Sequence, residues 1–276
     1  MASQSLGRGE RPRVMGILNL TPDSFSDGGR FATPETAVDA AAAMLADGAD
    51  IIDIGGESTR PGAEAVSEAQ ELERVVPVIE ALRARFAATL SVDTCKPVVM
   101  RAAVAAGATM INDVYALRRP GAIDAARELG VPVCLMHMQG EPRTMQQAPA
   151  YDDVVSEVRQ FLLDRAHACM QAGIARAALV LDPGFGFGKT LQHNLALLRG
   201  LRHIAAPGFP VLVGLSRKAL IGAVTGRAVG QRIHGSVALA VYAALNGAAI
   251  VRVHDVGATV DALKMIAAVA EESLNG

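Results

Sequence analysis

The chain has 276 residues, of which 51% are hydrophobic and 20% are charged, so it is long enough for one large globular domain and too apolar to be disordered. Its formal net charge is −2, with scattered lysines and arginines, which excludes the basic surface of a nucleic-acid-binding protein. Its three cysteines lie far apart and are odd in number, a pattern that argues against disulfides or a zinc ribbon and is typical of a reducing, cytoplasmic compartment.

The polar N-terminus lacks the apolar core of a signal peptide, and we expect residues 1–12 to form a flexible tail before a single domain over residues 13–276. The most apolar segment, residues 237–251 (VALAVYAALNGAAIV), is too short to cross a membrane and is interrupted by Asn246 and Gly247. It predicts a helix followed by a strand. We therefore expect neither a membrane nor a nucleic acid as a partner.

Short apolar runs rich in β-branched residues recur along the chain. They are Val14–Leu20, Ile51–Gly55, Leu90–Thr94, Met110–Val114, Pro132–His137, Leu179–Asp182, Val211–Ser216 and Ile250–Asp255. They are apolar throughout rather than alternating, which is typical of strands buried on both faces.

Helical patterns separate these runs. Thr33 before Pro34 predicts a helix start, and Ser67 with Gln70 predicts a capping box. Glycines stand where helices should end, at Gly107, Gly130 and Gly173. Alternation of strand and helix eight times without a linker predicts the α/β class and a single-domain (β/α)8 barrel. A doubly wound open sheet is the alternative.

The C-terminal ends of barrel strands form one rim, where barrel enzymes keep their active sites. Polar residues follow every predicted strand. They include Asn19, Asp53, Asp93, Asn112, His137, Asp182, Ser216, Arg217, Lys218, Arg252 and His254. So many polar groups after apolar strands indicate a site at this rim.

The chain is organised around residues 178–190 (ALVLDPGFGFGKT), where a buried strand ends at Asp182 and a glycine-rich loop follows. A Walker A loop is excluded because Pro183 stands six residues before Lys189, where that motif needs glycine. The glycine spacing does not fit a dinucleotide-binding loop either. We therefore expect an acidic strand end with a mobile loop.

The last two strands end in basic residues. Ser216, Arg217 and Lys218 follow the seventh strand, and Arg252 and His254 lie on one face of the eighth. Because barrels often bind phosphate after these strands and arginine matches phosphate well, we predict an anion site. Arginines paired with carboxylates and a satisfied histidine are the less favoured alternative.

Asp93, Asn112 and Asp182 end three other strands. They could read the donors of a guanidine-like heterocycle, act as an acid and base, or be structural partners, and their spacing does not decide among these. Two long loops, residues 19–33 and 55–67, are interpreted as substrate lids.

Other residues carry weaker signals. Asn19 and Asp27 supply oxygen atoms of the kind that Mg²⁺ prefers. His137 is interpreted as a hydrogen-bonded core residue, and Cys95 and Cys134 as small buried hydrophobes.

Seven segments carry a family resemblance. They are MGILNLTPDSFSDGG (15–29), DIGGESTRPG (53–62), SVDT (91–94), IND (111–113), LDPGFGFGK (181–189), SRK (216–218) and RVHDV (252–256). In content and order they resemble the dihydropteroate synthase family, over almost the whole chain. The strand-end trio is shared with pterin-binding methyltransferases, whereas the first two segments and SRK with RVH indicate the synthase.

The resemblance implies a barrel homodimer that condenses 6-hydroxymethyl-7,8-dihydropterin pyrophosphate with p-aminobenzoate. The products are 7,8-dihydropteroate and pyrophosphate, and Mg²⁺ is the cofactor. The resemblance therefore implies that the protein binds these small-molecule substrates and a second copy of the chain. Alanine-rich helices over residues 237–245 and 260–269 are the candidate dimer surfaces.

The resemblance also implies roles for individual residues. Those that hold the pterin are Asp93, Asn112, Met136, Asp182, Phe187, Gly214 and Lys218, with Asp93, Asp182 and Lys218 as the catalytic set. Those that hold pyrophosphate are Asn19, Arg252 and His254, and those that hold the metal are Asn19 and Asp27. Those that close over p-aminobenzoate are Phe25, Thr59, Arg60, Pro61 and Phe187.

The chain departs from the family at Ala219, where several members carry Ser or Arg after the SRK motif. This departure concerns the neighbourhood of the p-aminobenzoate carboxylate, while Lys218 is present. Two other functions are considered, a pterin-dependent methyltransferase and a non-catalytic pterin-binding protein. Both would lack a reason to retain the basic strand ends and the two long loops together.

Overall fold

The computed structural model describes residues 11–21, 34–58 and 66–272. Its strands are β1 (Arg13–Asn19), β2 (Ile51–Gly55), β3 (Thr89–Asp93), β4 (Met110–Asp113), β5 (Val133–Met136), β6 (Leu179–Asp182), β7 (Leu212–Gly214) and β8 (Ile250–Val253). Each lies within one of the predicted apolar runs or begins one residue before it. The sequence therefore located every strand.

All neighbouring strands are parallel, in the order β6-β5-β4-β3-β2-β1-β8-β7. The two outer strands of this order also meet, through a parallel bridge between Leu181 and Val211. The Leu181 N–H donates to the carbonyl of Pro210 at 2.9 Å. The sheet is thus a closed barrel, and the open doubly wound alternative is wrong.

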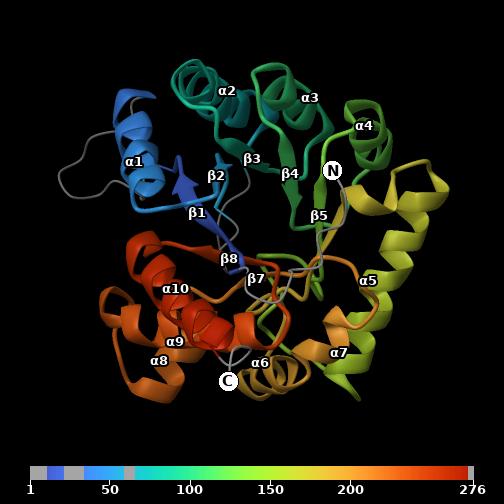
Figure 1. Ribbon diagram of the computed structural model, residues 1–276. Helices are drawn as coiled ribbons and strands as arrows, with labels where there is room; N and C mark the ends of the chain where they lie inside the picture. The colour runs from blue at the N-terminus through green and yellow to red at the C-terminus, as the bar shows by residue number, and fades with distance from the viewer. Residues whose placement is uncertain (1–10, 22–33, 59–65, 273–276) are drawn as a thin grey trace.

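Helices surround the strands on all sides (Figure 1). They are α1 (Pro34–Ala46), α2 (Glu68–Arg85), α3 (Pro97–Ala105), α4 (Ala122–Leu129), α5 (Val154–Gln171), α6 (Leu191–Arg199), α7 (Leu201–Ala205), α8 (Ala219–Thr225), α9 (Ile233–Leu245) and α10 (Val256–Glu272). This is the single-domain (β/α)8 barrel that the alternating pattern predicts.

The predicted helix ends are mostly confirmed. The side chain of Ser67 accepts from the backbone N–H of Gln70 in a capping box at the start of α2. Gly130 ends α4 with a φ of 64°, a left-handed conformation that favours glycine. Helix α1 begins at Pro34 as expected, and the capping residue Thr33 lies outside the described residues.

The predicted end of the seventh strand needs correction. Strand β7 ends at Gly214, two residues before the predicted end, because the chain turns there and Arg217 takes a φ of 58°. Arg11, in the segment predicted to be a tail, forms an ion pair with Asp50 at 2.7 Å.

The apolar segment at residues 237–251 is divided as predicted, between the end of α9 and the start of β8. In the described part of the chain, no helix is long and apolar enough to cross a membrane.

Candidate active site

The barrel interior changes from apolar to polar toward the C-terminal ends of the strands. Its apolar layer consists of Met15, Ile51, Met110, Cys134, Val180, Leu212 and Ile250. Alternate residues of a strand point to the same side. Two positions later the inward-facing residues are Ile17, Asp53, Asn112, Met136, Asp182, Gly214 and Arg252. An apolar plug therefore supports a layer that contains buried charges and an amide.

A cavity of about 800 Å³ opens at this polar end of the barrel, which is large enough for a drug-sized ligand. The predicted site residues that line it are Asn19, Asp93, Phe187, Lys218, Arg252 and His254. The other predicted residues in the described part adjoin this set. Gly214 lies close to Lys218 and Arg252, and Met136 packs in a small cluster with Phe187.

Asp182 ends β6 as a buried carboxylate beside the lysine that follows β7. Its Oδ1 accepts from the backbone N–H of Gly184 at 2.7 Å. Burial raises the pKa of Asp182, and the nearby Lys218 opposes that rise. Burial lowers the pKa of Lys218 to about 8, and Asp182 opposes that change in turn.

Lys218 is aimed by the loop that it crosses. Its Nζ donates to the carbonyl of Phe185 and lies 4.8 Å from the ring centre of Phe187. A cation over an aromatic ring is a favourable contact. Together with Asp182, the lysine gives the cavity a carboxylate and an ammonium group next to an aromatic face.

The glycine-rich loop after β6 is packed down rather than mobile, which corrects the sequence prediction. Gly184 and Gly188 have positive φ values, and a Cβ on either would come within 2.3 Å of a carbonyl oxygen after β5, at His137 or Gln139. Only glycine allows so close an approach. The loop therefore lies directly against the end of β5.

The buried side chain of Lys189 connects this loop to the residue after β5. It is 3% exposed, and its Nζ contacts His137 Nδ1 at 2.8 Å and donates to the carbonyls of Gly184 and Phe187 at 2.9 and 3.0 Å. Burial, and then the neighbouring Lys189, lowers the pKa of His137 to about 3. His137 is thus a neutral hydrogen-bonded core residue, as predicted, whereas its contact with Lys189 was not predicted.

The guanidinium of Arg252 lies between two carboxylates. Its Nε donates to Asp53 Oδ2 at 2.6 Å and its Nη2 donates to Asp93 Oδ2 at 3.0 Å. Asp53 also accepts from Nδ2 of Asn112 at 3.0 Å, so one buried cluster joins β2, β3, β4 and β8. Burial raises the pKa of Asp93 to about 8, although Arg252 opposes that rise.

The basic residues after β7 and β8 are already partnered. Arg217 forms an ion pair with Asp255 at 2.5 Å, and His254 Nδ1 lies 3.0 Å from Ser216 Oγ. The less favoured alternative, in which the arginines pair with carboxylates, is therefore correct for Arg217 and for Arg252. Lys218 differs from Arg217 and Arg252. It lines the cavity, and among the described residues no carboxylate lies within ion-pair distance of it.

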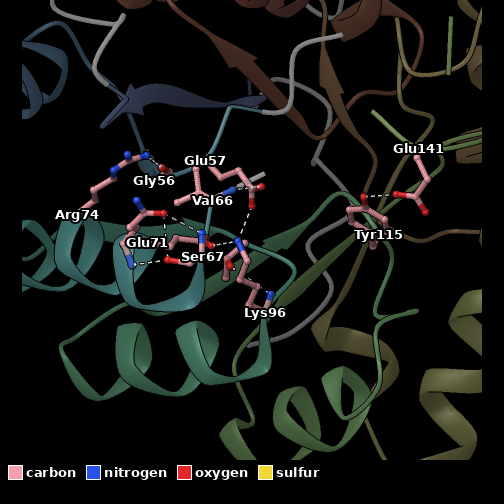
Figure 2. A network of polar contacts seen from close by, with 11 residues as sticks. Gly56, Glu57, Val66, Ser67, Glu71, Arg74, Lys96, Tyr115 and Glu141 are labelled. Carbon is pink, nitrogen blue, oxygen red and sulfur yellow. Dashed lines mark hydrogen bonds and ion pairs between the residues drawn. The ribbon is translucent and has the colours of Figure 1, made fainter. Parts of the chain in front are cut away.

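A second polar network secures the segment after β2 (Figure 2). Lys96 donates to Glu57 Oε2 at 2.6 Å and also to the buried Glu71 of α2. The other oxygen of Glu57 accepts from the backbone N–H of Val66 at 3.1 Å, and Arg74 donates to the carbonyl of Gly56 at 2.7 Å. Sequence reasoning missed this network because its members lie on separate elements.

Five predicted site residues are not part of this geometry. Phe25, Asp27, Thr59, Arg60 and Pro61 lie outside the described residues. Of the predicted metal ligands, Asn19 is described, and it lines the cavity at the end of β1. The described part of the chain contains no group of three His, Cys, Asp or Glu side chains that could hold a metal ion.

Replacing Asp93 with asparagine should change how stability depends on pH. Burial raises the pKa of Asp93 above the ordinary value of 3.8 that it has in the unfolded chain, although Arg252 opposes that rise. The folded protein therefore binds this proton more tightly than the unfolded chain does, and Asp93 contributes less to the free energy of unfolding as pH rises above 3.8. Since one pKa unit corresponds to about 1.4 kcal/mol, the variant should gain at least ~1 kcal/mol relative to the wild type from pH 5 to pH 8.

Urea unfolding of both proteins at several pH values measures this difference. Asp124→Asn is the control, because Asp124 is 62% exposed in a surface ion pair on α4. Its effect should be constant over the same range. A constant effect of Asp93→Asn as well would contradict the buried, proton-retaining environment.

Comparisons with known proteins agree with this geometry. A family model described as "Pterin binding enzyme" matches residues 15–254. The chain is 54% identical over 257 residues to a dihydropteroate synthase of Escherichia coli (strain K12), covering 93% of this chain and 91% of the relative.

Two solved structures of dihydropteroate synthase from Xanthomonas albilineans share the fold. The one with 4-aminobenzoic acid has a TM-score of 0.90 and 58% identity, and covers 95% of this chain and 94% of that chain. The one in complex with 7,8-dihydropteroate has a TM-score of 0.86 and 55% identity, and covers 95% of this chain and 96% of that chain.

Proposed function

The chain belongs to the dihydropteroate synthases of the pterin-binding enzyme family, and from that membership we propose how its cavity divides their reaction among individual side chains. The reaction condenses 6-hydroxymethyl-7,8-dihydropterin pyrophosphate with p-aminobenzoate, and yields 7,8-dihydropteroate and pyrophosphate. The observation that carries the proposal is the buried polar layer above an apolar plug, with a carboxylate, an ammonium group and an aromatic ring at one cavity.

The pterin ring lies in the polar layer. Asp182 accepts the two hydrogens of its guanidine-like edge, and Asp93 and Asn112 hold the opposite side. Lys218 bonds the ring, while Met136, Phe187 and Gly214 form the walls of its slot. Support comes from the burial of these groups, since hydrogen bonds in a cavity shielded from water discriminate strongly for a matching ligand.

The pyrophosphate is held by Asn19, Arg252 and His254. Arg252 already pairs with two carboxylates through Nε and Nη2, but a guanidinium carries five N–H donors, so it can still contact a phosphate. The carboxylates keep its charge and orientation fixed before substrate binds. The pyrophosphate therefore approaches a guanidinium that is already in position.

Mg²⁺ fits this site as an ion shared with the substrate. Asn19 offers an amide oxygen at the cavity, and magnesium commonly uses one or two protein ligands with water and phosphate oxygens. Asn19 is the described ligand in this proposal, and Asp27 acts through water. When bound, the ion neutralises charge on the leaving pyrophosphate.

The p-aminobenzoate lies between Phe187 and the two loops that carry Phe25, Thr59, Arg60 and Pro61. Its amine is a weak base and is already unprotonated at neutral pH, so it needs no general base. The Glu57–Lys96–Glu71 network supports this part of the proposal, because it fixes the residues on either side of the second loop.

Departure of pyrophosphate leaves a delocalised pterin carbocation. The aryl amine captures it, and the arylammonium formed loses one proton to water to give 7,8-dihydropteroate. The carboxylates of Asp93 and Asp182 stabilise positive charge on the ring, and a closed site keeps water away from it. This division of labour requires no activated serine or cysteine. It also assigns Arg252 and His254 to the leaving group, and Asp93 and Asp182 to the ring.

The two alternatives, a pterin-dependent methyltransferase and a non-catalytic pterin-binding protein, are not favoured. Neither needs a site for pyrophosphate beside the site for the ring. A homodimer is proposed from the exposed apolar side chains on α9 and α10, namely Tyr242, Leu245, Met265 and Val269. A cytoplasmic location is proposed from the three buried free thiols.

Pyrophosphate release from dihydropterin pyrophosphate tests the function. We expect release by the purified protein to require both p-aminobenzoate and Mg²⁺, and a chelator to lower it by at least about 100-fold, since the ion offsets leaving-group charge. Release without p-aminobenzoate would contradict capture by the amine. Tight methyltetrahydrofolate binding without release would favour the methyltransferase.

A further inference from the structure

Asp53 is a fully buried carboxylate to which no substrate contact is assigned above. It lies in the middle of β2, paired with Ile17 of β1 and Ser91 of β3, and is 0% exposed. Burying a carboxylate is costly unless it is paired and hydrogen-bonded. A charge at this depth in a barrel therefore needs a reason.

Its contacts identify the two groups that it serves. Oδ2 of Asp53 accepts from Nε of Arg252 at 2.6 Å and from Nδ2 of Asn112 at 3.0 Å. The same oxygen atom thus joins a group assigned to pyrophosphate and a group assigned to the pterin. Its other oxygen, Oδ1, is buried without a hydrogen-bond partner among the described residues.

The first consequence concerns the amide of Asn112. An ionised carboxylate only accepts hydrogen bonds, so the NH₂ of Asn112 must face Asp53 and its Oδ1 must face the other way. The opposite amide orientation would place two oxygens in contact. Asp53 therefore fixes the pattern of donor and acceptor that Asn112 presents.

The second consequence concerns Arg252. Its long side chain has many rotamers, and holding it in one of them costs conformational entropy. The bond from Nε to Asp53 and the bond from Nη2 to Asp93 are made by two different nitrogens of the planar guanidinium to two different carboxylates. Two such bonds fix the plane before any ligand arrives.

We propose that Asp53 is a positioning residue for this reaction, which orients the amide of Asn112 and the guanidinium of Arg252 at the same time. The inference rests on the roles proposed above for those two residues. Asp53 acts through them and not on the substrate. Through this one carboxylate, the half of the site that holds the ring and the half that holds the leaving group are aligned together.

The test is Asp53→Asn, which keeps the size of the side chain but supplies a single neutral acceptor. We expect kcat/KM for the pterin substrate to fall by about 10- to 100-fold, the range typical of residues that orient a first layer of ligands. The KM for p-aminobenzoate should stay within about two-fold, because Asp53 contacts no group assigned to it. A structural ion pair alone would lower the melting temperature and leave both kinetic ratios unchanged per folded molecule.

Calorimetry separates the two halves of the claim. Titration with 6-hydroxymethylpterin reports the Asn112 side, and titration with inorganic pyrophosphate and Mg²⁺ reports the Arg252 side. Asp53→Asn should weaken both. If it weakens one or neither, the claim that Asp53 serves both residues is wrong.

Double-mutant cycles add the readout that positioning requires. In an Asn112→Ala background, Asp53→Asn should cost much less in pterin affinity than in the wild type, because the residue through which it acts is gone. Additive effects would contradict the proposal. If Asp53→Asn does not fold, Asp53→Ala with added formate replaces it. We expect pterin affinity to recover as the formate concentration rises. No recovery would count against the proposal.

Ser91→Ala is the matched control. Ser91 pairs with Asp53 in the sheet, is 0% exposed, and its hydroxyl has no hydrogen-bond partner among the described residues. Its kinetics should match the wild type within about two-fold. If the wild-type protein shows no pyrophosphate release that depends on p-aminobenzoate, the proposed function is wrong. If the wild-type protein releases pyrophosphate normally and the kinetics of Asp53→Asn are unchanged, only the positioning role is wrong.

Discussion

Asp182→Asn should lower kcat/KM for the pterin substrate by about 100- to 1,000-fold, the cost of removing one preorganised group that faces developing charge. The substitution keeps an oxygen that can accept from the Gly184 N–H, now made at 2.7 Å. What it removes is a negative charge beside the ring and one acceptor for the guanidine-like edge. The loss should therefore appear in the kinetics and not in the fold.

Asp113→Asn is a control with the opposite expected pattern. Asp113 also ends a strand, is also buried, and also accepts from the N–H two residues later, that of Tyr115 at 2.8 Å. Its second oxygen accepts from the N–H of Leu117 at 2.8 Å, and as the neighbour of the inward-facing Asn112 it lies on the outer side of the strand and is not among the residues that line the cavity. An amide would turn a donor toward one of these N–H groups, at a cost of about 1–3 kcal/mol.

Thermal melting and steady-state kinetics of both variants test the expectation that one loses activity and the other loses stability. Asp182→Asn should melt within a few degrees of the wild type and lose activity, while Asp113→Asn should melt lower and keep kcat/KM per folded molecule. Equal loss of activity in the two would show that any strand-end carboxylate is needed for the fold. Unchanged kinetics for Asp182→Asn would remove that residue from the site.

The barrel was predictable because its signal is local. Each strand is an apolar run bounded by polar residues, and burial of both faces follows from composition alone. The rim followed from the same reasoning, since parallel strands end at one edge. Asp93, Asn112, Asp182 and Arg252 were found in this way, one strand end at a time.

What the sequence could not supply is which strand end pairs with which. Arg252 and Asp53 are 199 residues apart, and Lys189 and His137 are 52 apart. Closure of the barrel brings these pairs together, and no local pattern encodes the match. That is why Asp53 looked like one polar residue among many, and why the arginines were expected to be unpaired.

The prediction that the glycine-rich loop is mobile was wrong for a different reason. Glycine permits flexibility, and it equally permits close packing of two backbones, and the sequence does not distinguish the two uses. Lys189 decides the question here, because its three contacts hold the loop against β5 and position Phe187. The sequence analysis did not predict that the lysine of this loop is buried.

Gly184→Ala should therefore lower the free energy of unfolding by about 3 kcal/mol or more, combining left-handed strain with steric overlap. The residue has a φ of 67°, and a Cβ would lie 1.9 Å from the carbonyl oxygen of His137. Gly130→Ala separates the two causes, because Gly130 has a φ of 64° and a Cβ there meets nothing within 4 Å. Only the strain remains at Gly130, so its cost should be about 1 kcal/mol.

Urea unfolding of the two variants measures the difference, which is the steric contribution alone. Folded Gly184→Ala protein should also lose pterin affinity, because the loop can relieve the overlap only by moving away from β5 and taking Asp182 and Phe187 with it. Gly130→Ala, at the far end of α4, should bind normally. Equal unfolding costs would mean that the loop yields freely, and the close contact between the backbones after β5 and β6 could not then be what holds Asp182 in place.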